Sequence, residues 1–292
     1  MDTRTEKPVV VGIDGSGRAL RALIWGARDA FLHALPLRIV HTLPRYEADF
    51  PLFPPGRFEV AEGRAREAVA EAVALVEQAY PDVRIETATP MSSPAAALVE
   101  ASGTAHAVVL GSKGDNVGNL LLGSTALQVV GHTDCPVVVV GHVSAGHDRV
   151  AVGTDGSANS LPALAYAFDQ AQLRGAELRV VSALGLPQGW PRHLLRPLPE
   201  DDDEVAARRA EIEAQVAPLL ERHPGVKVTL DVHRLDPLET LEIASHHADL
   251  LVLGSRGRGG FHGLALGSTT HQMLHFATCP VAVVRSGAPT AG

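Results

Sequence analysis

The sequence predicts an α/β protein of two repeated, doubly wound domains, each built on a five-stranded parallel sheet. The first observation is an internal repeat, because VVVGIDGS at residues 9–16 returns as VAVGTDGS at residues 150–157. The second is that short apolar runs alternate with amphipathic stretches in each half, as strands and helices do in parallel βαβ units. A chain of 292 residues, 46% of them apolar, is also long enough to bury two cores.

The repeat is colinear, but its spacing changes along the chain. Asp14 and Asp155 lie 141 residues apart, the glycine loops 143, and the closing cysteines Cys135 and Cys279 144. The second half has therefore gained two residues before the glycine loop and one inside it. We expect domains at residues 1–143 and 147–286, joined by a short linker, and a disordered tail at residues 287–292.

Each element of the first half follows from its own pattern. Residues 9–13 form an apolar run closed by Asp-Gly-Ser, which predicts a buried strand and a turn. Residues 18–33 carry apolar side chains at helical spacing, and residues 60–80 carry an alanine and valine stripe opposite glutamates and arginines. The remaining predictions are strands at residues 37–43, 83–88, 105–110 and 136–140 and helices at residues 94–102 and 124–131. The second half repeats this order, except that Pro218 predicts a kink or break inside its long helix.

Ligands of doubly wound sheets bind beyond the carboxyl ends of the strands, and a glycine loop follows a predicted strand there in each half. In the second half the loop reads Gly254-Ser-Arg-Gly257, nine residues, then Gly267-Ser268-Thr269 at a helix start. Glycines let backbone N–H groups face an anion, and the positive helix end favours phosphate. The alternative is a flexible solvent loop whose serine caps the helix. Recurrence of the loop in both halves favours a ligand, although the P-loop and dinucleotide fingerprints are absent from the sequence.

Asp14 and Asp155 each end a first strand immediately before a turn. A carboxylate at this place can accept hydrogen bonds from ribose hydroxyls or hold a magnesium ion through water. It can equally form an Asx turn or cap the next helix. The position in the sequence leaves these alternatives open.

The composition argues against several function classes. Aromatic residues make up only 4%, which disfavours a protein that stacks nucleic-acid bases, and a net charge of −8 without a Lys/Arg run disfavours any nucleic acid or anionic membrane as partner. The N-terminus has no apolar signal core and no apolar run approaches the ~20 residues of a membrane span, so we expect a cytoplasmic protein. The two cysteines are expected to be buried thiols, and no metal site is predicted, because no His/Asp/Glu spacing recurs in both halves.

Three features together resemble the universal stress protein family: the strand-Gly-x-Asp-Gly-Ser start, the Gly-x2-Gly-x9-Gly-Ser loop and the closing Cys-Pro-Val strand. The resemblance covers nearly the whole chain, and the duplication is similar to that of the tandem members common in actinobacteria. It implies Rossmann-like domains of the universal stress protein type. Family members that bind ATP share the glycine loop, so the resemblance implies ATP as the ligand, with Mg²⁺ accompanying the nucleotide.

The resemblance also implies the contact residues. Gly12 with Asp14 and Gly153 with Asp155 correspond to ribose contacts, and the backbone of Thr42 and Ala183 to adenine contacts. The phosphate loops correspond to Gly111, Ser112, Lys113, Gly114, Gly123, Ser124 and Thr125 in the first half and to Gly254, Ser255, Arg256, Gly257, Arg258, Gly259, Gly267, Ser268 and Thr269 in the second.

The first half departs from the loop pattern. Only eight residues separate Gly114 from Gly123, and Asp115 and Asn116 replace the Arg-Gly pair of the second half. A carboxylate near phosphates is repulsive, so we expect the second half to bind nucleotide more tightly.

These features favour an ATP-binding regulator or sensor of the stress response, and not an enzyme. No residue set recommends itself as a general base beside a γ-phosphate, so any ATP hydrolysis is expected to be slow. Two alternatives stay open, because one superfold hosts many functions. One is an ATP-dependent enzyme, and the other is a protein-interaction module with vestigial nucleotide sites.

The closing strands at residues 136–140 and 280–284 are short and very apolar. A terminal strand of an open sheet can be an edge with unpaired backbone groups, which a partner then covers. We expect the two strands to pair within one chain as an intrachain pseudo-dimer. The resemblance adds the expectation of a homodimer of tandem chains.

Overall fold

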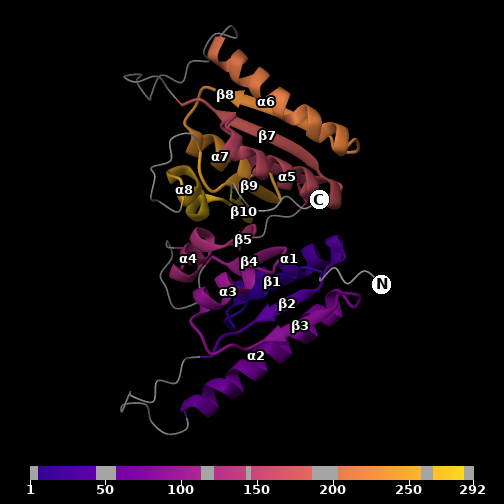
Figure 1. Cartoon of the computed structure of the whole chain (residues 1–292), viewed down its shortest axis with the longest axis vertical. Coiled ribbons are helices and arrows are strands. Elements are labelled where there is room, and N and C mark those ends of the chain that lie inside the picture. Colours follow the sequence, from indigo (N-terminus) through magenta and orange to yellow (C-terminus); the bar gives the residue numbers. More distant parts are fainter. Residues whose placement is uncertain are drawn as a thin grey trace. The chain divides into compact units, whose positions relative to one another are not determined.

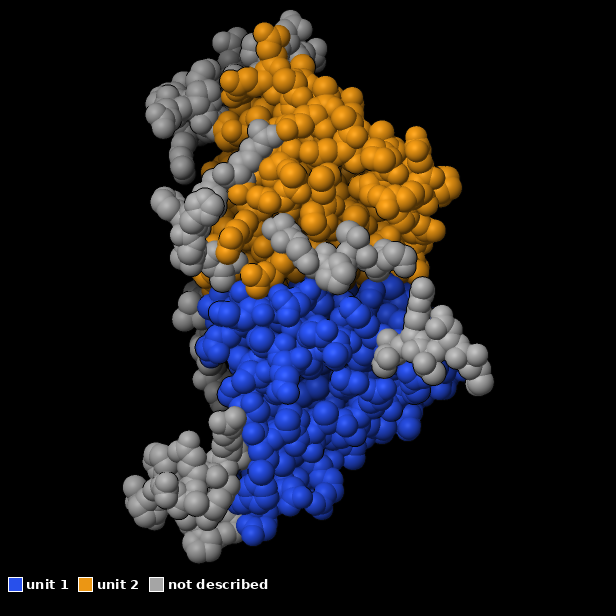
Figure 2. Space-filling view, viewed as in Figure 1, with its two compact units in different colours: residues 1–141 blue, residues 142–292 orange. Residues whose placement is uncertain are grey.

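The computed structural model describes residues 6–43, 57–112, 122–142, 146–185, 203–257 and 266–285 (Figure 1). The chain divides into two compact units, Met1–Gly141 and His142–Gly292, which Figure 2 colours separately. Each unit is an α/β domain with a five-stranded, fully parallel sheet among its described residues, which confirms the predicted fold class. The predicted tail at residues 287–292 lies outside the described residues.

The sheet of the first unit has the order β3-β2-β1-β4-β5. Its strands are β1 (Val9–Gly12), β2 (Leu37–Val40), β3 (Ile85–Ala88), β4 (Ala107–Gly111) and β5 (Val137–Val140). The helices are α1 (Gly17–His33), α2 (Arg57–Ala79), α3 (Pro94–Ser102) and α4 (Ser124–His132). The chain leaves β1 toward β2 and later returns to β4 on the other side of β1. Right-handed crossovers therefore place α1 with α2 on one face and α3 with α4 on the other.

The second unit repeats this topology with the order β8-β7-β6-β9-β10. Its strands are β6 (Arg149–Gly153), β7 (Glu177–Ala183), β8 (Val228–His233), β9 (Leu250–Gly254) and β10 (Val281–Val284). The helices are α5 (Leu161–Arg174), α6 (Asp203–Arg222), α7 (Pro237–Ser245) and α8 (Ser268–Phe276). The central strand of each unit, β1 or β6, is where the strand order reverses, and ligands bind at such a point in open α/β sheets.

The core of each unit is the central part of its sheet, covered on both faces. Val9, Val10 and Val11 of β1 have no exposed surface, as expected for a parallel strand between two helix layers. Fully burying one such side chain contributes about 1.5–3 kcal/mol. Gly26 lets α1 approach closely, because a Cβ there would lie 2.5 Å from the Val11 side chain.

One local prediction is wrong. α6 continues through Pro218 to Arg222, although proline lacks the N–H and crowds the preceding turn. Ile212, Val216 and Leu219 are buried on both sides of the proline. Their packing holds the helix together against a proline penalty of about 3 kcal/mol.

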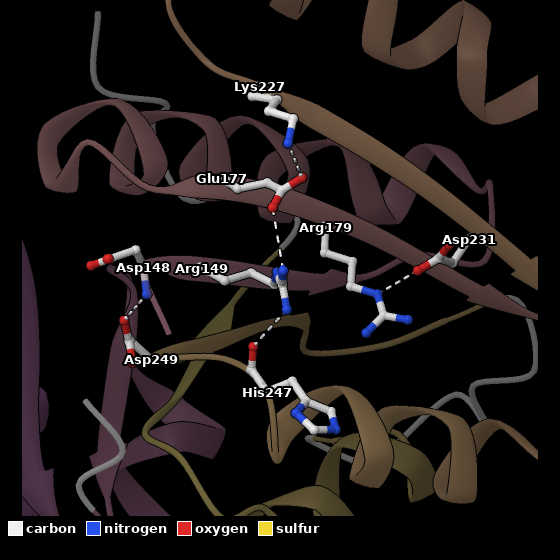
Figure 3. A network of polar contacts seen from close by, with 8 residues as sticks. All are labelled: Asp148, Arg149, Glu177, Arg179, Lys227, Asp231, His247 and Asp249. Atoms are coloured by element: carbon white, nitrogen blue, oxygen red, sulfur yellow. Dashed lines mark hydrogen bonds and ion pairs between the residues drawn. The ribbon is translucent and has the colours of Figure 1, made fainter. Parts of the chain in front are cut away.

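A polar network ties the amino ends of the strands of the second unit (Figure 3). Glu177 accepts from Arg149 at 3.3 Å and lies 3.2 Å from the ammonium of Lys227. The hydrogen bonds from Lys227 and then Arg149 lower the pKa of Glu177 below its usual value. Arg179 pairs with Asp231 across β7 and β8. This end of the sheet is therefore held by ion pairs, whereas the opposite end is open.

Candidate functional site

Each unit has a cleft at the carboxyl ends of its central strands. The first encloses about 220 Å³ and the second about 740 Å³. The predicted residues that line the first cleft are Gly12, Asp14, Thr42, Gly111, Ser112, Gly123, Ser124 and Thr125. Those that line the second are Gly153, Asp155, Ala183, Gly254, Arg256, Gly257, Gly267, Ser268 and Thr269. Ser255 is buried beneath the loop, and Lys113, Gly114, Arg258 and Gly259 lie outside the described residues.

The aspartate turns have the same geometry in both units. Asp14 Oδ1 accepts the N–H of Ser16 at 3.0 Å, and Asp155 Oδ1 accepts the N–H of Ser157 at 2.9 Å. Both carboxylates therefore form Asx turns, one of the alternatives left open by the sequence. A carboxylate has about four acceptor sites, so the turn bond leaves room for a second role at a ribose.

The second unit joins its aspartate turn directly to its glycine loop. A Cβ on Gly257 would lie only 2.7 Å from Asp155 Oδ2. The loop backbone thus passes against the carboxylate, and only glycine fits there without displacing Asp155. This contact brings the candidate ribose and phosphate sites, 102 residues apart in the chain, into one cleft.

The helices that open on the clefts begin without a side-chain cap. α4 and α8 have Gly123 and Gly267 as N-cap residues, and no side chain accepts from their first turns. By contrast, the hydroxyls or carboxylate of Ser16, Ser93 and Asp236 cap α1, α3 and α7. The serine-capped alternative for the loop is therefore wrong. N–H groups at the start of α4 and α8 are oriented toward an anion in the cleft.

The loops are closed from within by backbone bonds. Gly123 donates to Ser112 O at 2.7 Å, and Gly267 donates to Ser255 O at 2.8 Å. In the second unit Thr270 Oγ1 also donates to Gly254 O at 2.8 Å, but the corresponding residue of the first unit is Ala126. Ser124 and Ser268 stay exposed at the helix starts, so their hydroxyls can donate to a bound group.

The candidate adenine positions follow from strand alternation. Val40 O accepts the N–H of the residue that follows β1, and Val181 O accepts the N–H of Thr154, both at 2.9 Å. Backbone groups two residues further along a strand face the same side. Thr42 and Ala183 therefore direct their backbone groups past the ends of β1 and β6, into the clefts that they line.

The floor of each cleft is apolar and was not predicted from the sequence. A Cβ on Gly12 would lie 2.8 Å from Leu98, and a Cβ on Gly153 would lie 2.8 Å from Leu241. These leucines come from α3 and α7 and line the two clefts. The matched positions show that the wall is a feature of both units.

The sequence analysis also missed Arg208, which reaches the second cleft from α6. Its side chain is 11% exposed, and its Nε lies 3.2 Å from Glu211 Oε2. Beside this pair, Gln215 Nε2 donates to Gly156 O at 2.6 Å. The spacing that relates the prolines after the two long helices places Ala65 at the position of Arg208. An arginine on an otherwise apolar stripe was the signal available in the sequence.

The cysteines agree with their predicted role as buried thiols. Cys135 and Cys279 are 5% and 2% exposed and free of disulfides. Burial raises the pKa of both thiols to about 12. No helix in the described part of the chain combines the length and the apolar character needed to cross a membrane.

Comparison with known proteins identifies both units. The model of the universal stress protein family matches residues 6–141 and again residues 146–285. The chain is 35% identical to a universal stress protein of Mycolicibacterium smegmatis over 98% of this chain and 99% of that protein. It is 37% identical to one from Mycobacterium tuberculosis over 97% of this chain and 98% of that protein.

A solved structure has the same fold over nearly the full length. The crystal structure of a universal stress protein from Archaeoglobus fulgidus superposes with a TM-score of 0.71 at 20% identity, covering 95% of this chain and 96% of that one. The tandem α/β fold, the paired clefts and the two family matches lead to one conclusion: this chain belongs to the universal stress protein family, with one family domain in each half.

Proposed function

We propose that the clefts bind an adenine nucleotide, ATP with Mg²⁺, and that the chain acts as a nucleotide-dependent regulator or sensor in the stress response. The observation that carries the proposal is the pair of uncapped helix starts, each opening on a cleft beside an aspartate turn. The other helix N-termini of the same layers have side-chain caps at α3 and α7. An anion at α4 and α8 would satisfy the N–H groups that no side chain satisfies.

The second cleft has a group for each part of the nucleotide. The backbone at Ala183 faces the place of the base, and Asp155 can accept from the ribose hydroxyls. Ser268 and the start of α8 can donate to phosphate oxygens, and Arg256 supplies positive charge. Mg²⁺ would be held chiefly by the phosphates, with water completing its shell.

A binding role is favoured over catalysis by what lines the clefts. Asp14 is the only acidic or basic side chain among the described residues of the first cleft. The described lining of the second adds Asp155, Arg208 and Arg256. Neither set pairs a general base with a group that holds it against a γ-phosphate. We therefore propose at most slow ATP hydrolysis.

Calorimetric titration of the full chain with Mg-ATP tests the proposal. Gly267→Asp would place a carboxylate at the candidate phosphate site, where a like charge about 4 Å away costs about 4 kcal/mol at an effective dielectric of 20. The matched control is Gly267→Asn, because a Cβ there meets its neighbours at 3.6–3.9 Å and the backbone φ of −69° suits any residue. Loss of one site in the aspartate variant alone supports the assignment.

Two other outcomes would overturn the proposal. Equal binding by the parent and both variants would remove the loop from the site. An absence of adenine nucleotide binding by the folded parent would favour the interaction module, and rapid turnover of ATP would favour the enzyme.

We further propose, from the sequence pattern and the resemblance, that residues 136–140 and 280–284 pair within one chain and that tandem chains dimerise. Limited proteolysis in the linker followed by size-exclusion chromatography tests the pairing. Clipped halves that separate as folded monomers would contradict it. Light scattering of the intact chain measures the homodimer.

A further inference from the structure

A cluster of ligand-type side chains lies at the opposite end of α1 from the first cleft. Asp29 and His33 are one turn apart near the end of α1, and His106 immediately precedes β4. Each offers one ligand atom, and the three atoms all lie within 4.8 Å of one another. The length of α1, about 24 Å at 1.5 Å per residue, separates this cluster from the aspartate turn. None of the three residues lines the cleft.

The hydrogen bonds of the cluster prepare His33 as a ligand. His33 Nδ1 lies 2.8 Å from the backbone carbonyl of Asp29, and a carbonyl can only accept, so Nδ1 carries the proton. The lone pair of a neutral ring is then on Nε2. Metal-bound histidines typically donate their other N–H to a carbonyl or carboxylate, which fixes the ring. The side chain of His33 is 11% exposed, so the site is shielded but reachable.

His106 contributes the clearest sign that something is missing from the cluster. Its Nε2 atom is buried and has no hydrogen-bond partner in the protein. Burial first, then His33 and Lys7, lower the pKa of His106 to about 4, so the ring is neutral at physiological pH. Its ring centroid lies 4.5 Å from that of His33. A buried imidazole nitrogen without a partner is uncommon, because desolvation without a bond is costly.

The carboxylate completes a donor set of two imidazoles and one oxygen. Asp29 has no exposed surface, and a buried carboxylate is stabilised by a nearby cation. We propose that Asp29, His33 and His106 bind a divalent transition-metal ion of the zinc class, with water in the remaining position. Imidazole ligands favour zinc and its neighbours over Mg²⁺ or Ca²⁺. Ligand atoms around tetrahedral zinc lie roughly 3.4 Å apart, so small side-chain movements would close the site.

The second unit shows how the same place is built without a metal. The repeat places Gln170, Arg174 and Asp249 at the three matching positions. Arg174 Nε donates to Gln170 Oε1 at 2.8 Å. Asp249 accepts the backbone N–H of His147 at 3.2 Å and of Asp148 at 2.9 Å, the latter bond being visible in Figure 3. Protein groups thus provide bonds there that a metal would provide in the first unit.

Titration of the nucleotide-free full chain with Co²⁺, followed by its visible absorption, tests the proposal, with Zn²⁺ competition as a second readout. The parent is expected to show one site with the bands of low-coordinate cobalt and a Zn²⁺-dependent rise in melting temperature. His106→Gln and His33→Gln are each expected to weaken this site about tenfold or more. A triple variant, Asp29→Gln with His33→Arg and His106→Asp, copies the second unit and is expected to fold without the site.

Two controls separate the cluster from exposed histidines. His132 makes the same bond to a carbonyl one turn earlier, Gln128 O at 2.8 Å, but is exposed, so His132→Gln should leave the site intact. His271 and His275, whose rings lie 5.1 Å apart on α8, could chelate weakly, so His271→Gln is the second control. The proposal is overturned if the parent shows no such bands, if the triple variant keeps them, or if His271→Gln removes them.

Discussion

The two clefts share their backbone and differ in the side chains that surround it. Each has an Asx turn after its first strand, a loop closed by a glycine N–H, and an uncapped helix start. The second cleft, at about 740 Å³ against 220 Å³, also receives Arg208 from α6. At the matching positions of α2 the first unit has Ala65 and, opposite Glu211 and Gln215, Ala68 and Ala72.

The difference shows which features a duplicated site must keep. Backbone N–H groups at a helix start can hold a phosphate whatever the neighbouring side chains are. Charge from a distant helix is an addition that one copy can carry alone. We therefore expect both units to recognise the same chemical class and to differ in affinity.

The largest expected effect separates the two clefts. Gly123→Asp should leave only the second cleft able to bind Mg-ATP, and Gly267→Asp only the first. The remaining site of the Gly123→Asp variant should bind about tenfold more tightly, a difference of about 1.4 kcal/mol, because Arg208 and Arg256 line the second cleft. Calorimetry of both variants measures the ratio. Equal constants would break the comparison.

Arg208→Ala should remove much of that advantage. A hydrogen bond to a charged group contributes about 1.5–3 kcal/mol, so the second site should weaken about tenfold in the same titration. Arg209→Ala is the matched control, because Arg209 is an exposed neighbour that bonds to Leu230 O.

A double variant, Arg208→Ala with Glu211→Gln, removes the carboxylate that the single change leaves near the cleft. Recovery to the parent affinity in the double variant would assign the effect to Glu211. Unchanged binding in Arg208→Ala itself would remove the arginine from the site.

Thr270→Ala should lower the stability of the second unit with a smaller effect on binding. The change removes the bond from Thr270 Oγ1 to Gly254 O, which is 2.8 Å long and has no counterpart at Ala126. We expect a loss of about 1 kcal/mol in the free energy of unfolding, measured by urea denaturation. Thr270→Ser keeps the hydroxyl and should retain most of the stability. A serine variant as unstable as the alanine variant would point to packing instead.

The smallest expected effect is on the acid stability of the second unit. Lys227 and Arg149 lower the pKa of Glu177 in the folded protein. The stabilisation is therefore present above the unfolded pKa, about 4.5, and is lost as the pH falls through the folded pKa. Glu177→Gln should lower the melting temperature slightly at neutral pH and not at all in strong acid. The first unit has Pro36 at this position, so its transition is the internal reference.

Much of the fold was predictable because its causes are local. Apolar runs, turn residues and helical periodicity predicted the order of strands and helices in both units, and helix α3 starts and ends as predicted. The chain spacing also predicted which glycines and aspartates recur in the clefts. Strand ends were less predictable, because β2 ends at Val40 once β1 has turned away, leaving only a bridge between Leu43 and Met91.

The sequence by itself determined the duplication, the parallel α/β architecture and the chemistry of the two loops, because each is encoded in residues close together in the chain. Only the tertiary structure decided which distant side chains join them. Arg208 reaches the second cleft, and His106 meets His33 across 73 residues, because the packing of helices on the sheet brings these positions together. Spacing along the chain contains no such information, since strand order and the side of the sheet on which each helix packs set these contacts.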